Sequence, residues 1–231
     1  LIEDQYQQYQ AAIPETINQT ALSAAMAVCP FSNVGLNEDG LSDQLFDKSN
    51  VHEDDVIGVY RSLYAGHVVE GNYRKQATSG GIISWTLSKL LQRDMVDAVI
   101  HVRKSLQQGT LFEYGISKNF EDVIAGAKSR YYPIEMSRVI EFVTENKGRY
   151  VFVGLPCFIK AVRKYCQYEP LIRERIRFCI GLVCGHLKSK AFTDMIGWQA
   201  GIEPGNVADI DFRVKLPDCS SDNYGILIED R

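Results

Sequence analysis

The segment YVFVGLPCFIKAVRKY, residues 150–165, limits the possible folds more than any other part of the chain. It opens with five residues that suit a buried strand, because none of them carries a charge and most are strongly apolar. A tight turn follows, and the next eight residues have the spacing of a helix. A buried strand that passes directly into a helix is typical of a βαβ unit. The segment therefore predicts an α/β protein.

The remaining sequence repeats this alternation of strands and helices. The pattern predicts a mainly parallel sheet with helices on both faces. Strands are expected at residues 56–69, 98–102, 112–119, 175–184, 208–215 and 224–231. Helices are expected after the Ser79-Gly80-Gly81 turn and at residues 119–127, 136–148, 158–165 and 188–201.

The N-terminal part differs from the rest in being rich in turn residues and acids. We interpret residues 1–57 as an irregular segment that cannot form a core alone, with a helix in 11–28 and a short one at 42–48. Thr16 or Asn18 would cap the first helix. The main domain is expected at 58–231, in an N-terminal part, 58–135, and a C-terminal part, 136–231. Because the chain lacks an initiator Met and ends on a strand-like segment, we expect it to be part of a longer protein.

Composition excludes several classes of function. The formal net charge is -4, so no basic field indicates a nucleic-acid partner. No apolar run of transmembrane length and no secretory signal are present, so membrane insertion is not expected. The six cysteines are too sparse for a disulfide scaffold in a chain of 231 residues. A cytoplasmic protein with free or metal-bound thiols fits this composition.

Cys157 and Cys184 are the first candidates for a functional site. Each comes at the end of a predicted strand and precedes a predicted helix, and they are 27 residues apart, about the length of one βαβ unit. If the two strands are neighbours, both sulfur atoms lie at one edge of the sheet, where metal binding or redox chemistry is possible. The alternative is that both are inert core cysteines. Cys166 and Cys179 are interpreted as packing residues, and Cys219 as either a ligand or an exposed thiol.

Two short segments are candidates for binding a phosphorylated cofactor. In QATSGG, small residues precede a helix, and this arrangement lets backbone N–H groups approach an anion. Plain helix capping is the alternative. In KSRYYP, basic and aromatic side chains could hold a phosphate and stack on a flat ring, although a solvated loop is equally compatible. The candidate contacts are Thr78, Ser79, Gly80, Gly81, Lys128, Ser129, Arg130 and Tyr131. His186 is a candidate proton donor, or a histidine with a structural hydrogen bond.

Several motifs in order resemble one known family. RKQATSGGIISWTLSKLLQRDMVDAVI resembles the N-terminal signature of the coenzyme F420 hydrogenase/dehydrogenase beta-subunit family. VGLPCFIKAVRKY resembles its VGxPCxIxxLRK motif, and FCIGLVCGHLKSKAF with WQAGIEPGNVADIDFRVK resembles its C-terminal part. The resemblance covers roughly residues 56–231.

The resemblance implies an oxidoreductase that contains FAD and 4Fe-4S clusters and exchanges electrons with a partner protein or subunit. It places the flavin against the Ser79-Gly80-Gly81 turn, with Lys128 to Tyr131 as further contacts. It makes Cys157 and Cys184 candidate cluster ligands, with Cys219 a less certain third.

The chain departs from the family pattern near its N-terminus. Family members often carry a ferredoxin motif of the form C-x2-C-x2-C-x3-C-P. Here Cys29-Pro30 keeps only the end of the motif, because the other positions are Gln19, Leu22 and Ala25. This loss favours a second hypothesis, a non-catalytic interaction module of a larger enzyme or of a polysaccharide-synthesis system. Assembly as an oligomer is compatible with both hypotheses. A metal-free dithiol protein using Cys157 and Cys184 is a third.

Overall fold

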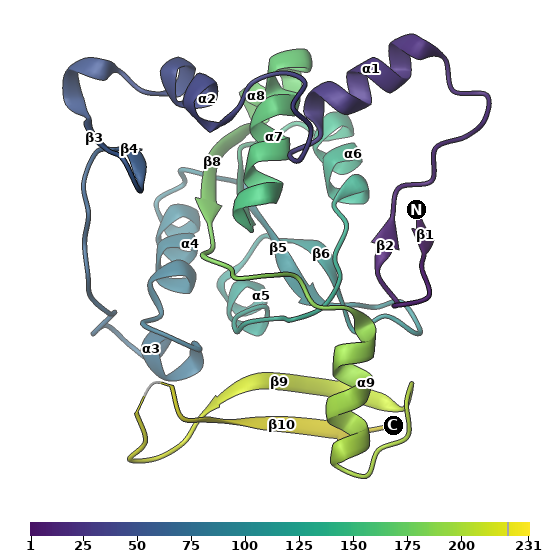
Figure 1. Ribbon diagram of the computed structural model, residues 1–231. Helices are drawn as coiled ribbons and strands as arrows, with labels where there is room; N and C mark the ends of the chain where they lie inside the picture. Colours follow the sequence, from purple (N-terminus) through teal and green to yellow (C-terminus); the bar gives the residue numbers. More distant parts are fainter. Residues whose placement is uncertain (221) are drawn as a thin grey trace.

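The computed structural model describes residues 1–220 and 222–231, and its centre is a four-stranded sheet in the order β6-β5-β7-β8 (Figure 1). Three strands are parallel and β6 pairs antiparallel with β5 at one edge. The bounds are β5 Ala98–Lys104, β6 Phe112–Ser117, β7 Tyr150–Gly154 and β8 Ile176–Gly181. The predicted α/β fold with a mainly parallel sheet is confirmed. Strand β6 reverses because only seven residues, 105–111, join it to β5, too few for a helical crossover.

Helices cover both faces of this sheet, as expected. Because side chains alternate along a strand, Val99 and Val151 pack against helices α4 and α5, whereas Ile100 and Phe152 pack against α6, α7 and α8. All four side chains have 0% exposure, so the sheet has a core on each side. The bounds are α4 Ile82–Gln92, α5 Phe120–Ala125, α6 Ser137–Glu145, α7 Pro156–Tyr168 and α8 Pro170–Arg175.

The C-terminal strands do not join the central sheet. β9 (Val207–Lys215) and β10 (Tyr224–Asp230) form a separate antiparallel hairpin, and helix α9 (Lys190–Gln199) packs on it. Phe212 and Ile210 are buried there beside Phe112 of β6 and form a third core. Figure 1 shows the hairpin and α9 below the edge at which β8 ends. The sequence pattern predicted these strands but not their separate sheet.

The N-terminal segment is built from short elements around two helices. Helix α1 begins at Gln19, later than the pattern suggested, and Asn18 caps it by accepting a 2.7 Å hydrogen bond from the Ala21 N–H. Between residues 1 and 57 only Ala27 and Leu41 are buried, so the segment has no core of its own. The bounds are β1 Ile2–Glu3, β2 Tyr9–Gln10, α1 Gln19–Val28, α2 Glu38–Leu45, the 3-10 turn η1 Lys48–Asn50, β3 His52–Asp54 and β4 Gly58–Tyr60. The expected division at 57/58 falls in the turn between β3 and β4.

Two of the predicted strands extend well past the strands that form. The strand expected at 56–69 was wrong beyond Tyr60, because residues 61–69 have no partner strand and the side chains of Tyr64 and Val69 are about nine-tenths exposed. The short helix α3 (Tyr73–Gln76) follows. Strand β8 ends at Gly181, so Cys184 lies in the loop beyond it and not within the strand. In the part of the chain that the structure describes, no helix has the length and apolar character needed to cross a bilayer.

Buried His101 on β5 makes the fold sensitive to acid. Its ring nitrogen Nε2 is 2.8 Å from the Ser117 hydroxyl, and burial, with a smaller effect from the Arg103 charge, lowers its pKa from 6.5 to about 4. Between pH 4 and pH 6.5, His101 is therefore protonated in the unfolded chain but neutral in the folded protein. We expect the free energy of unfolding to fall by about 3 kcal/mol as the pH drops from 6.5 to 4.

This expectation can be measured by urea unfolding at pH 7 and at pH 4.5. In a His101→Gln variant, which cannot be protonated, the difference between the two pH values should shrink. An unchanged pH dependence in the variant would show that other groups cause the acid sensitivity.

Candidate cofactor-binding site

The turn that precedes α4 contains four of the predicted site residues, Thr78 to Gly81. Gly81 is the N-cap of α4 and has a φ of +79°, a conformation that glycine adopts readily. No side chain caps this helix end, so no side chain occupies its first N–H groups. Anion binding at this turn stays a prediction. The glycines also have a packing role. A Cβ on Gly80 would lie 3.0 Å from the Gly66 carbonyl oxygen, and one on Gly81 would lie 2.7 Å from the Tyr73 carbonyl group.

The two segments predicted to bind a cofactor meet in the fold. The hydroxyl oxygens of Thr78 and Ser129 are 3.1 Å apart, although the residues are 51 positions apart in the sequence. The neighbouring Lys128 has a φ of +90° and forms a 3.0 Å salt bridge with Asp211 of β9. The loop after α5, the turn before α4 and the C-terminal hairpin therefore converge at one place.

Arg130 and Tyr131 turn toward the protein and not toward an open site. The Arg130 guanidinium lies 4.7 Å from the centre of the Phe112 ring and donates hydrogen bonds to the Ala127 and Ile210 carbonyls. Burial lowers its pKa, and nearby aspartates partly offset that effect. The Tyr131 ring packs edge-on against Phe212. Contact of these two side chains with a flavin stays a prediction.

The expected neighbour relationship behind Cys157 and Cys184 is present. β7 and β8 pair in parallel, with Gly154 opposite Gly181, so each cysteine comes three residues after a paired strand end. Cys157 is half-buried in the first turn of α7, a helix whose N-terminus no side chain caps. Tyr114 lies nearby, and its hydroxyl donates a hydrogen bond to the Val153 carbonyl. Burial raises the pKa of Tyr114, and the proximity of Cys157 raises it further.

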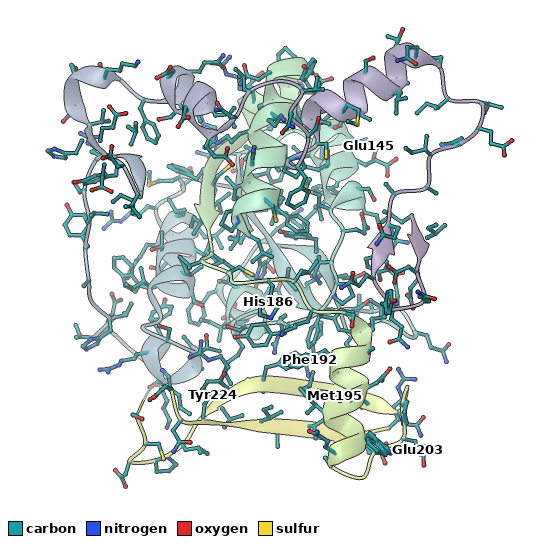
Figure 2. All side chains as sticks on the ribbon, in the orientation of Figure 1. Glu145, His186, Phe192, Met195, Glu203 and Tyr224 are labelled. Carbon is teal, nitrogen blue, oxygen red and sulfur yellow. The ribbon has the colours of Figure 1, made fainter. Side chains whose placement is uncertain are left out.

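The loop after β8 is exposed. The Cys184 thiol donates a 3.4 Å hydrogen bond to the His186 carbonyl, and both side chains are exposed. Figure 2 shows His186 between the central sheet and the hairpin. This position suits a residue that meets a ligand at the sheet edge, but no hydrogen bond of its ring is described, so its role as a proton donor stays a prediction.

The remaining cysteines lie apart from this edge or inside the core. Cys219 is exposed in the loop between β9 and β10, where the Asn223 side chain approaches its sulfur atom at 3.6 Å. Cys166 is buried, which raises the pKa of its thiol to about 11, and Cys179 packs against the same core. Among residues 1–220 and 222–231, no three His, Cys, Asp or Glu side chains form a group able to hold a metal ion. Cys157, Cys184 and Cys219 are therefore not assembled into a common site.

The degenerate ferredoxin motif has a helical structure. Gln19, Leu22 and Ala25 all lie in α1, and Cys29 follows the helix end. The Cys29 carbonyl accepts a 2.9 Å hydrogen bond from Lys164 of α7. A lysine contact therefore anchors the part of the chain in which the family motif would carry cluster ligands.

Sequence reasoning missed the basic residues that surround the Thr78–Ser129 contact. Lys215, at the end of β9, donates hydrogen bonds to the Ser79 carbonyl at 2.8 Å and to the Arg74 carbonyl. The only signal was the alternation of basic residues in the segment RVK at the end of β9. That signal could not reveal that a separate hairpin would reach the turn before α4.

Comparison with known proteins assigns the chain to a family. Sequence models of the coenzyme F420 hydrogenase/dehydrogenase beta subunit match residues 63–141 with the N-terminal part and residues 147–228 with the C-terminal part. The two matches together cover more than half of the chain. The chain belongs to this beta-subunit family. It is a family of oxidoreductases, and the resemblance in the sequence motifs is confirmed.

A solved structure has the same fold. One chain of the F420-reducing [NiFe] hydrogenase complex from Methanosarcina barkeri superimposes with a TM-score of 0.56 at 20% sequence identity. The alignment covers 70% of the present chain and 57% of the hydrogenase chain, so the present chain corresponds to little more than half of that subunit. No curated protein matches the sequence.

Proposed function

We propose that the protein is a flavin-dependent oxidoreductase that passes electrons between a reduced carrier, a deazaflavin such as F420 or another donor, and a 4Fe-4S cluster. The observation that carries this proposal is the meeting of Thr78 and Ser129 at the uncapped end of α4, beside Lys128. Hydroxyls, cations and free N–H groups are the partners that a flavin nucleotide needs for its phosphates. These residues therefore fit the phosphorylated part of FAD.

The protein's contribution is to bind and orient the flavin at the carboxyl edge of the sheet. A flavin supplies the chemistry, since it exchanges electrons in pairs or singly. Ser129 and Thr78 would orient its phosphorylated part, and the α4 dipole would favour the negative charge. The exposed His186 is the candidate proton donor at this edge. The electron-donating partner would be a separate protein or subunit.

The cysteines of the described residues do not form a complete iron–sulfur site. A 4Fe-4S cluster takes four cysteine thiolates, and only Cys157 and Cys184 follow neighbouring strand ends. The described residues do not fit a complete cluster site, because no third ligand joins these two. Further ligands would have to come from a rearranged loop after β8 or from a partner. Cys157 and Cys184 are therefore candidate ligands of a cluster that the described residues do not complete.

The proposal is tested by purifying the full-length protein without air and recording its visible spectrum and iron content. Flavin bands with a broad iron–sulfur shoulder are expected. Cys157→Ser should remove the shoulder and the iron but leave the flavin. Cys166→Ala, on the same helix, should retain both because Cys166 packs in the core.

Each alternative outcome has a distinct meaning. A shoulder that survives Cys157→Ser would contradict the ligand assignment only. A colourless, well-folded protein would contradict the oxidoreductase proposal and favour the module that binds another enzyme, which the helical form of the degenerate motif also favours.

A further inference from the structure

Lys215 connects the C-terminal hairpin to the turn before α4. Its ammonium group donates to the backbone carbonyls of Ser79 and Arg74, which belong to a distant part of the chain. The side chain comes from the last residue of β9 and remains largely exposed. The lysine therefore lies at the surface of the turn, where a ligand at the α4 end could reach it.

The surroundings of Lys215 are strongly positive. Burial lowers its pKa, and the neighbouring charges of Arg74, Lys128 and Arg213 lower it further. We call these four residues the basic cluster. Within the cluster, the carboxylate of Asp211 pairs with Lys128 at 3.0 Å. Four cations brought together from α3, the loop after α5 and β9 repel one another, so an anion that enters the cluster would be stabilised.

The contacts of Lys215 differ from the other contacts that hold β9 to the body. Asp209 of β9 pairs with Lys104 at 2.5 Å, and Asp211 pairs with Lys128 at 3.0 Å. Both are ordinary salt bridges that join a lysine to a carboxylate. Lys215 instead meets neutral carbonyls and like charges. If Lys215 only held the hairpin in place, a carboxylate partner would stabilise that contact more than two neutral carbonyls do.

We propose that Lys215 is a ligand for the diphosphate of the flavin nucleotide, so that the C-terminal hairpin and the turn before α4 bind this group jointly. The inference rests on the proposed flavin function and adds the basic cluster to its site. A diphosphate carries several negative charges and fits a position lined by cations, the Thr78 and Ser129 hydroxyls and the N–H groups of α4. The site would thereby distinguish FAD from a flavin without phosphate.

The test compares the binding of FAD and of riboflavin to the full-length protein by the change in flavin fluorescence. Lys215→Met should weaken FAD binding about ten- to a hundredfold, the range for losing one charged hydrogen bond, and leave riboflavin binding unchanged. Lys215→Arg should recover most of the FAD affinity because it keeps the charge. Lys104→Met is the matched control, since it removes a salt bridge from the same strand away from the cluster.

The outcomes separate this inference from the proposed function. If the wild-type protein binds FAD but Lys215→Met binds it equally well, the inference is overturned and the flavin function stands. If the variant loses riboflavin and FAD affinity alike, or Lys104→Met has the same effect, Lys215 acts through the hairpin structure and the inference is also overturned. If the wild-type protein binds neither flavin, the proposed function itself fails.

Discussion

Gly81→Ala is expected to destabilise the protein by about 2–6 kcal/mol and to abolish flavin binding. Gly81 has a φ of +79°, which costs any residue with a Cβ, and the added Cβ would lie 2.7 Å from the carbonyl carbon and oxygen of Tyr73. It would also lie 2.8 Å from the Arg74 nitrogen. All three atoms belong to the backbone and cannot rotate away. The chain would have to separate α3 from the start of α4, and the predicted binding turn would change shape.

Gly66→Ala provides the matched control for this prediction. Gly66 lies against the same turn, but an added Cβ would meet no atom within 4 Å and its φ is not positive. Alanine there should leave the free energy of unfolding unchanged or raise it slightly by restricting the unfolded chain. Urea unfolding of both variants gives the comparison. Equal stability of Gly81→Ala and Gly66→Ala would show that the close approach of α3 to the turn is not maintained in solution.

The central sheet was predictable because its strands are apolar on both faces. Residues 150–154 and 98–102 can be buried only inside an α/β sandwich, and the structure places them in adjacent parallel strands. The segment 56–69 has a similar content of β-branched and aromatic residues but ends as an exposed connection beyond Tyr60. Residue type indicates a capacity for strand formation, whereas a strand also requires a free edge to pair with. That requirement depends on the tertiary structure and is not visible in the local sequence.

The candidate site was predictable only in part for a similar reason. The turn at Thr78 and the loop at Ser129 each carry local signals, and the structure brings them to 3.1 Å. The pairing of β7 with β8 also follows from βαβ geometry. Lys215 gave no such signal, because its position depends on a hairpin that leaves the central sheet and packs beneath it. The interior contacts of Arg130 were also invisible, since a basic residue in a polar loop is normally solvated.

Lys164 organises the N-terminal segment and supports the second large prediction. It lies on α7 with 2% exposure, and its ammonium group donates to the carbonyls of Cys29 at 2.9 Å and Val34 at 3.1 Å. Gly35 packs beside its side chain, so the loop after α1 wraps around the lysine. Helices α1 and α2 both contact α7, and Figure 1 shows them beside its end. The segment has almost no buried apolar side chains of its own, so this polar anchor has a large share in holding it.

Lys164→Met is therefore expected to release the N-terminal segment, at a cost of about 3–5 kcal/mol for two hydrogen bonds from a buried charged donor. Limited proteolysis should cut the variant within residues 1–57 much faster than the wild type and leave the rest of the chain intact. Lys160→Met is the control one turn away. Lys160 pairs with the largely exposed Glu38, and such a pair contributes about 1 kcal/mol or less.

The two lysine variants also distinguish two possible roles for the degenerate ferredoxin motif. If a lysine contact holds the loop after α1 in place of a cluster, Lys164→Met should loosen the segment without changing the iron content of the protein. A loss of iron together with the release of the segment would instead connect Cys29 to a cluster. Equal protease resistance in Lys164→Met and Lys160→Met would contradict the anchoring role. Helix α7 carries Cys157 in its first turn and Lys164 two turns later. The same helix therefore joins the N-terminal segment to the sheet edge at which Cys157 lies.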